Sequence, residues 1–306
     1  SEMCIRDRNI SYAIDHGVDM VISHHPFLFK PIHDIDLSTC KGRMIENLIR
    51  HRITSFAAHT NLDSAIQGVN DALAEKLGLQ ECKGFVPVMT YSSYKFTLYI
   101  TAAHAKLLKK KLDSLRGKDI ESYYVVDDAD DFTENIRVEF RVPGQLVKQV
   151  KDMISSLDKS AKYDVYKLVN HGYKETMGRI GKFPFPMSVE EALSYIKNKL
   201  EIPVLRYAGN RDRLVEKIAI LGGAGAEFAG VAKSMGADLY LTGDLKYHEA
   251  QDAAMNGLVI ADGGHFYTER VIIPYLAKRL RDEFKTRGWN VGVLEDVRAK
   301  DIFHCV

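Results

Sequence analysis

Two adjacent histidines, His24 and His25, follow the short apolar run of residues 20–22 after one serine and precede Pro26. Pro26 disfavours both further strand pairing and a helix that begins one residue earlier, so the run predicts a buried strand that ends at the histidines. In open α/β sheets, ligands bind at the carboxyl ends of strands, and neutral imidazole is a common ligand of divalent metals. A histidine pair satisfied by local hydrogen bonds remains the alternative until further ligands are found.

Two further strand ends carry a histidine that is followed four residues later by a carboxylate. The first is in ITSFAAHTNLD and the second is in LVIADGGHFYTE. One helical turn separates His265 from Glu269, so both side chains can face one point if a helix begins there. Three imidazoles and two carboxylates suit a pair of divalent transition metals that share one bridging carboxylate. These candidate ligands are His24, His25, Asp63, His265 and Glu269.

A pair of divalent ions at such a site has a definite chemistry. Two ions roughly 4 Å apart lower the pKa of a bridging water and supply hydroxide at neutral pH, which is what a hydrolase needs. Three other side chains close to these strand ends are then predicted to be catalytic or pocket residues that transfer protons or orient the ligands. They are His59, Asp244 and His248.

An internal repeat relates the two halves of this constellation. The segment AIDHGVDMVISHH, residues 13–25, aligns without gaps on AKSMGADLYLTGD, residues 232–244, and places Gly17 on Gly236. Short βα units can align by chance. The matched spacing from histidine to carboxylate at both later strand ends nevertheless favours a duplication. We therefore expect an α/β fold with two duplicated α/β lobes.

The middle of the chain follows a different pattern. Between about residues 94 and 169 the apolar periodicity predicts strand, helix, strand, strand, helix and strand, which is the βαββαβ order of a ferredoxin-like domain. We expect an N-terminal α/β lobe over residues 1–90 and an inserted ferredoxin-like domain over residues 91–175. A C-terminal α/β lobe over residues 176–306 is expected to complete the metal site.

The N-terminal lobe has an unusual start. Its first eight residues, SEMCIRDR, carry no usable periodicity. The C-terminal lobe opens with two predicted strands, IPVLRYAG and VEKIAILGG, where the N-terminal lobe has only NISYAIDHG. We expect this lobe to be truncated and the natural protein to begin some tens of residues earlier.

One glycine-rich stretch has more than one interpretation. GGAGAEFAG, residues 222–230, follows the apolar run KIAIL and is similar to a dinucleotide-binding fingerprint, but it lacks the third glycine in register. We interpret it as a tight turn from strand to helix, which could also cradle an anion.

Composition limits the remaining functions. The 306 residues suffice for two domains, and 42 basic and 41 acidic residues, mixed along the chain, leave a net charge of +1 and no basic stripe for nucleic acid. The four cysteines are scattered without a CxxC pair, which favours a reducing cytoplasm over a disulfide framework or a thiolate zinc site. No apolar run approaches the roughly eighteen residues of a membrane span. We therefore expect a cytoplasmic protein with a small-molecule substrate and neither a membrane nor a nucleic-acid partner.

Four ordered motifs resemble those of a known family. They are SHHP at residues 23–26, HTNLD at 59–63, TGDLKYHEAQDA at 242–253 and GHFYTE at 264–269. Together they resemble the NIF-three-like dinuclear metal centre proteins, also called the GTP cyclohydrolase I type 2 family. The resemblance implies two duplicated lobes, a ferredoxin-like insertion, two divalent metal ions (zinc, iron or manganese) and a homohexamer.

The resemblance also implies roles for individual residues. His59 is the repeat's counterpart of His265, yet it does not correspond to a ligand of the family, so we predict it to be a pocket residue. Glu269 corresponds to the bridging carboxylate. The implied ligands are His24, His25, Asp63, His265 and Glu269.

The sequence therefore predicts a dinuclear metal-dependent hydrolase that acts on a nucleotide-like or phosphorylated small molecule, and by resemblance a GTP cyclohydrolase I type 2 homolog. The alternative is a non-enzymatic metal-binding oligomer that acts through protein partners. An enzyme needs an open coordination position and a substrate pocket, whereas a metal carrier needs only the ligands.

Overall fold

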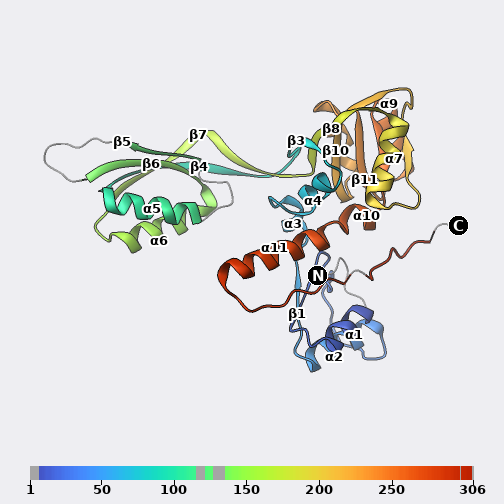
Figure 1. The fold of residues 1–306 in the computed structure, drawn as a ribbon, viewed down its shortest axis with the longest axis horizontal. Coiled ribbons are helices and arrows are strands. Elements are labelled where there is room, and N and C mark those ends of the chain that lie inside the picture. Colours follow the sequence, from blue (N-terminus) through green and yellow to red (C-terminus); the bar gives the residue numbers. More distant parts are fainter. Residues whose placement is uncertain (1–6, 115–120, 127–134, 297, 305–306) are drawn as a thin grey trace. The chain divides into compact units, whose positions relative to one another are not determined.

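The computed structural model describes residues 7–114, 121–126, 135–296 and 298–304. The chain forms two compact units, which are drawn in Figure 1: unit 1 comprises Ser1–Val86 and Thr176–Val306, and unit 2 comprises Pro87–Glu175. Helices accompany a two-stranded, a six-stranded and a four-stranded sheet in the described residues, which confirms the predicted mixed α/β class. None of the helices in these residues is both long and apolar enough to cross a membrane.

The six-stranded sheet forms the centre of unit 1. Its three middle strands, β10, β11 and β12, pair in parallel, and β8 pairs antiparallel with both β10 and β3. The short strand β9 pairs antiparallel with β12 at the other edge. In spatial order the strands are β3 (Gln80–Lys83), β8 (Arg179–Ser188), β10 (Leu214–Ala224), β11 (Leu239–Gly243), β12 (Val259–Asp262) and β9 (Arg206–Ala208).

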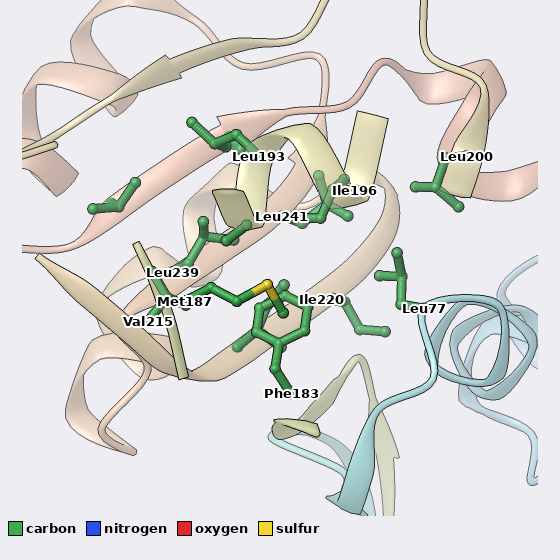
Figure 2. Packing of buried hydrophobic residues seen from close by; sticks show 14 of the residues in the cluster. Leu77, Phe183, Met187, Leu193, Ile196, Leu200, Val215, Ile220, Leu239 and Leu241 are labelled. Atoms are coloured by element: carbon green, nitrogen blue, oxygen red, sulfur yellow. The ribbon is translucent and has the colours of Figure 1, made fainter. Parts of the chain in front are cut away.

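Helices cover both faces of this sheet. Helices α4 (Val69–Lys76) and α7 (Val189–Leu200) contribute to one apolar core, and α8 (Ala229–Ser234) and α9 (Tyr247–Met255) contribute to the other. Successive residues of a strand point to opposite faces, so the central stretches 218–221, 239–241 and 259–261 of the middle strands are apolar rather than alternating with polar residues. Figure 2 shows the first core, where Leu239 and Leu241 of β11 lie among residues of α7. Tyr240, between them, belongs to the second core.

The N-terminal part of unit 1 contains a smaller sheet. Strands β1 (Met20–Ser23) and β2 (Thr54–Ala57) pair in parallel, which confirms the predicted strand before the two histidines. Helices α1 (Asp7–Asp15) and α2 (Cys40–Arg50) pack with β1 around a separate apolar core. An apolar core of its own therefore supports this small sheet and its carboxyl end.

Short helices follow the later strand of two parallel pairs, β1–β2 and β11–β12. Helix α3 (Thr60–Ser64) follows β2, and α10 (His265–Glu269) follows β12. The beginning of α10 at His265 meets the condition under which His265 and Glu269 face one point. Helix α11 (Ile272–Arg287) comes next and ends at Gly288, whose φ of 68° is the left-handed conformation common at such ends. Residues of α4, α10 and α11 share one apolar cluster, which holds α10 against the other two helices.

In the described residues of unit 2, the principal elements follow the order strand, helix, strand, strand, helix, strand. The strands lie in the spatial order β5-β6-β4-β7, and alternate residues of β4 and β6 pack with the two helices, which lie side by side (Figure 1). The elements are β4 (Val86–Thr101), α5 (Ala102–Ser114), β5 (Glu121–Val126), β6 (Asn135–Pro143), α6 (Val147–Leu157) and β7 (Lys162–Met177).

Candidate metal centre

The structure brings the five predicted ligands to one place, with the carboxylate of Glu269 at the centre. Its Oε2 lies 2.8 Å from Nε2 of His25, and its Oε1 lies 3.0 Å from Nε2 of His265 and 3.6 Å from Nε2 of His24. Oδ1 of Asp63 lies 3.4 Å from Nε2 of His24. Residues more than 200 positions apart in the sequence thus converge on one carboxylate, which is buried together with His24 and Asp63.

Two imidazole rings are fixed by hydrogen bonds on the side away from Glu269. Nδ1 of His24 donates to the carbonyl oxygen of Ala58 at 2.7 Å, and Nδ1 of His265 donates to Oδ2 of Asp244 at 2.8 Å. A carbonyl or carboxylate oxygen can only accept, so each Nδ1 carries a proton and each Nε2 is directed at the cluster. Asp244 reaches His265 from a left-handed backbone conformation, with a φ of 55°.

Gly223, at the end of β10, lies against Glu269 from the side of the main sheet. Its amide donates to Oγ1 of Thr268 at 3.0 Å, and its carbonyl oxygen accepts from Oγ1 of Thr242 at 3.0 Å. A Cβ at this position would lie 2.3 Å from Oε1 of Glu269, and the φ of +71° also favours glycine. The glycine therefore permits the close approach that the cluster requires.

A buried amide side chain connects the N-terminal and C-terminal parts of the centre. Asn70 donates from Nδ2 to the carbonyl oxygen of Asp63 at 2.9 Å, and its Oδ1 accepts from the amide of Gly222 at 3.0 Å. The predicted turn at residues 222–230 is present, because β10 ends at Ala224 and α8 follows. The amides of Gly222 and Gly223 are bonded within the protein, which leaves neither for the anion cradle that the sequence also allowed.

The charges of the cluster are strongly coupled. Burial alone would raise the pKa of Glu269, but the hydrogen bonds from His25 and His265 and the nearby imidazole of His24 outweigh burial and hold this pKa well below its usual range. The hydrogen bond with Glu269 raises the pKa of His265 to about 9 against the effect of burial. Burial raises the pKa of Asp63 to about 6. The arrangement thus concentrates negative charge on Glu269, with imidazoles around it.

The donor atoms fit a divalent transition-metal ion. Within the part of the chain that the structure describes, Nε2 of His24 and Oδ1 of Asp63 are buried without a hydrogen-bond partner, although they face each other. Unpaired buried polar atoms are costly, and a cation held between them would satisfy both. Two sets of three donors have their atoms within 4.8 Å of one another, as metal ligands do: His24 with His25 and His59, and His25 with His265 and Glu269.

The remaining predicted site residues differ in their positions. The ring of His59 lies 5.3 Å from that of His24 and 4.9 Å from that of His25, and burial together with these imidazoles lowers its pKa. His59 therefore lies within the centre and belongs to one of the two donor sets. His248 is exposed in the first turn of α9, and its ring contacts that of Tyr247 at 5.5 Å. Among the described residues, no hydrogen bond or ion pair joins His248 to the predicted ligands.

Two residues that build the centre were not identified from the sequence. Gly223 was assigned to a turn, which is correct for the backbone but does not reveal its approach to Glu269. Asn70 lies in α4, and none of the predicted site residues is next to it in the sequence. Its contacts with Asp63 and Gly222 therefore arise only from the fold.

The fold and the donor cluster define an α/β protein with a candidate metal centre at the carboxyl ends of parallel strands. Residues 4–300 match the family described as Duf34/NIF3 (NGG1p interacting factor 3), and the chain belongs to this family. The resemblance predicted from the four motifs is thus confirmed over nearly the whole sequence.

Curated relatives and solved structures agree with this membership. The chain is 32% identical to the GTP cyclohydrolase 1 type 2 homolog of Halalkalibacterium halodurans over 96% of this chain and 85% of the relative. It is 32% identical to the protein of the same name in Bacillus subtilis, over 93% of this chain and 82% of the relative. The structure of a Bacillus cereus protein related to NIF3 matches with a TM-score of 0.82 and 31% identity, over 100% of this chain and 88% of the other.

Proposed function

We propose that the protein is a dinuclear metal-dependent hydrolase that acts on a nucleotide-like or phosphorylated small molecule. The observation that supports the metal site most directly is the buried pair of unpartnered atoms, Nε2 of His24 and Oδ1 of Asp63, beside the carboxylate of Glu269. The substrate class is supported by the relatives, which are called GTP cyclohydrolase 1 type 2 homologs.

In this proposal each residue of the centre has its own task. Zinc, iron or manganese ions, when bound, would act as Lewis acids and would lower the pKa of a bound water, so that hydroxide would be available near neutral pH. Glu269 would serve as the bridging ligand, and the other proposed ligands are His24, His25, Asp63 and His265. Asp244 orients the ring of His265 through its hydrogen bond to Nδ1.

Two histidines are proposed for proton transfer. The lowered pKa of His59 keeps its imidazole neutral at neutral pH, so this half-buried ring can accept a proton close to the ligands. His248 lies four residues after Asp244, in the first turn of α9, which follows the end of β11, and it is proposed to transfer protons or to orient the substrate.

The architecture belongs to the same proposal. We propose that the parallel pairs β1–β2 and β11–β12, each followed by a short helix that carries a carboxylate, are duplicated α/β lobes. The strand order of unit 2 supports a ferredoxin-like insertion. The proposed domains are an N-terminal lobe over residues 1–90, an insertion over 91–175 and a C-terminal lobe over 176–306. A homohexamer in the cytoplasm, without nucleic-acid or membrane partners, completes the proposal.

Metal content provides the first test. The protein is expected to bind about two divalent ions per chain, because five ligands exceed the three or four that one ion needs. Combining His24→Ala with Glu269→Gln should remove both ions, whereas His51→Ala, which removes an exposed imidazole at the end of α2, should remove neither. Elemental analysis that finds equal metal in the double variant and the parent would refute the site.

Turnover provides the second test and separates the enzyme from the alternative, a metal-binding oligomer that acts through protein partners. The metal-loaded protein is incubated with a panel of nucleotides and phosphoesters. Hydrolysis that disappears in the double variant supports the enzyme. Full metal content without hydrolysis of any panel member would support the metal-binding oligomer.

A further inference from the structure

Helix α10 separates the metal centre from an open cavity of about 580 Å³, whose lining includes none of the five proposed ligands. His265 and Glu269 take part in the centre, whereas Phe266, and Arg270 just after the helix, line the cavity. We propose that this cavity binds an organic anion, with an apolar or planar body against its wall and a phosphate or carboxylate among its cations. The volume lies in the range of about 300 to 1,000 Å³ that is usual for small-molecule sites.

The wall of the cavity is apolar. Phe266 is buried within the cluster that joins α4, α10 and α11, and Val271, Ile273 and Leu200 line the cavity with it. Apolar surface of this kind gains from contact with the carbon skeleton of a ligand, and an aromatic ring favours a planar body. The wall thus explains why an organic anion is expected rather than an inorganic ion alone.

Four cationic side chains from separate parts of the fold line the same cavity. Lys76 comes from α4, Lys199 from α7 and Lys278 from α11, while Arg270 follows α10. Lys76 and Lys199 lie in the last turns of their helices, where the helix dipole favours a cation in any case. Arg270 likewise follows the last residue of α10, whereas Lys278 lies within α11 and is not explained by a helix dipole. The convergence of all four on one concave surface raises the local concentration of anions.

The cations remain available in different degrees. Arg270 is paired with Glu201 and lies over the rings of Phe266 and Tyr267, at 5.7 and 5.8 Å from the ring centroids, so its position is fixed. Lys278 is paired with Asp282 at 3.0 Å on the exposed side of α11. For Lys76, the described residues provide no hydrogen bond or ion pair. Lys199 lies over the ring of Tyr195, at 5.5 Å from its centroid, so Lys76 is the cation with the least competition for a ligand.

Two carboxylates also line the cavity, but they do not cancel its charge. Asp296 already accepts hydrogen bonds from Arg298 at 2.7 Å and from Asn9 at 2.8 Å, so its charge is compensated. Arg270 and Lys278 are compensated in the same way by Glu201 and Asp282, which leaves Glu75 as an acidic group opposite Lys76 and Lys199. The net charge of the lining therefore favours an anion over a cation.

The test measures binding of 1-naphthylmethylphosphonate, which combines a planar body with a phosphonate and contains no ester to hydrolyse. Inorganic phosphate and 1-naphthalenemethanol represent its two parts. The metal-free protein is used, so that metal ions in the centre cannot hold the phosphonate. Naphthalene fluorescence measures binding of the probe and of 1-naphthalenemethanol, and displacement of the probe measures binding of phosphate. The complete probe is expected to bind saturably and at least tenfold more tightly than either part.

Charge reversals then locate the site. Lys76→Glu and Lys199→Glu are each expected to weaken probe binding about fivefold or more. Lys197→Glu is the matched control, because Lys197 lies in the same last turn of α7 but does not line this cavity, and it should change binding less than twofold. No saturable binding, or equal effects of the variants at Lys199 and Lys197, would overturn the proposal. Because the metal-free protein is used, neither result depends on the hydrolase proposal.

Discussion

Gly223 and Glu269 lie so close together that a Cβ added to the glycine would come within 2.3 Å of Oε1 of the glutamate. The neighbouring hydrogen bonds to Thr268 and Thr242 hold Gly223 on both sides, so the backbone cannot easily move away. The position of the proposed bridging ligand in α10 therefore depends on the absence of a side chain at Gly223 in β10.

The first prediction follows from this contact. Gly223→Ala is expected to displace the carboxylate of Glu269 and to lower metal content, and the φ of +71° adds a destabilisation of about 1 to 3 kcal/mol. Gly230→Ala is the control, because a Cβ there meets nothing within 4 Å and the residue lies in α8. Elemental analysis and thermal unfolding are measured on both variants. Full metal content in Gly223→Ala would show that Glu269 is not held as the structure indicates.

The second prediction concerns the amide that connects the two parts of the centre. Asn70→Ala leaves the carbonyl oxygen of Asp63 and the amide of Gly222 buried without partners, which should cost about 2 to 4 kcal/mol of unfolding free energy. Asn198→Ala, at an exposed position of α7, should cost well under half of that. Denaturant unfolding compares the two variants. Similar losses would argue against a connecting role for Asn70.

The third prediction separates ligands from proton-transfer groups. His248→Ala should retain the metal and lower turnover by roughly 10²- to 10⁴-fold, since a positioned acid or base contributes about that much. Metal content and hydrolysis rate are measured on the same sample at several pH values around neutrality. Lost metal would make His248 a ligand, and an unchanged rate on a substrate of the parent protein would remove it from the mechanism.

The fourth prediction concerns pH and a carboxylate outside the centre. Hydrogen bonds from Arg298 and Asn9 hold the pKa of Asp296 well below its usual range, against the effect of burial. A depressed pKa in the folded state stabilises the protein fully above the unfolded value of about 3.9, and this contribution is lost as the pH falls. Asp296→Asn should therefore lower the unfolding free energy at pH 7 by about 1 to 3 kcal/mol and by less near pH 3. An equal difference at both pH values would contradict this origin.

The sequence revealed the parts of the centre that have local signals. A proline after two histidines marked the end of β1, and the four-residue spacing from His265 to Glu269 required the helix that α10 provides. By contrast, the contact between Gly223 and Glu269 depends on how β10 and α10 pack, and no local pattern encodes that distance. His59 shows the same limit, because its spacing matches that of a ligand, while its final place depends on the rings around it.

Strands β3 and β8 are partners in one antiparallel ladder, with Lys83 opposite Ile180, although all of unit 2 separates them in sequence. In topological terms unit 2 takes the place of the loop of a β-hairpin. The entropic free-energy cost of closing a flexible loop rises by only about 0.6 kcal/mol for each doubling of the loop length, so a hairpin tolerates a connection of this size. A short turn could therefore replace unit 2 between β3 and β8. The order of strands in the six-stranded sheet would stay the same.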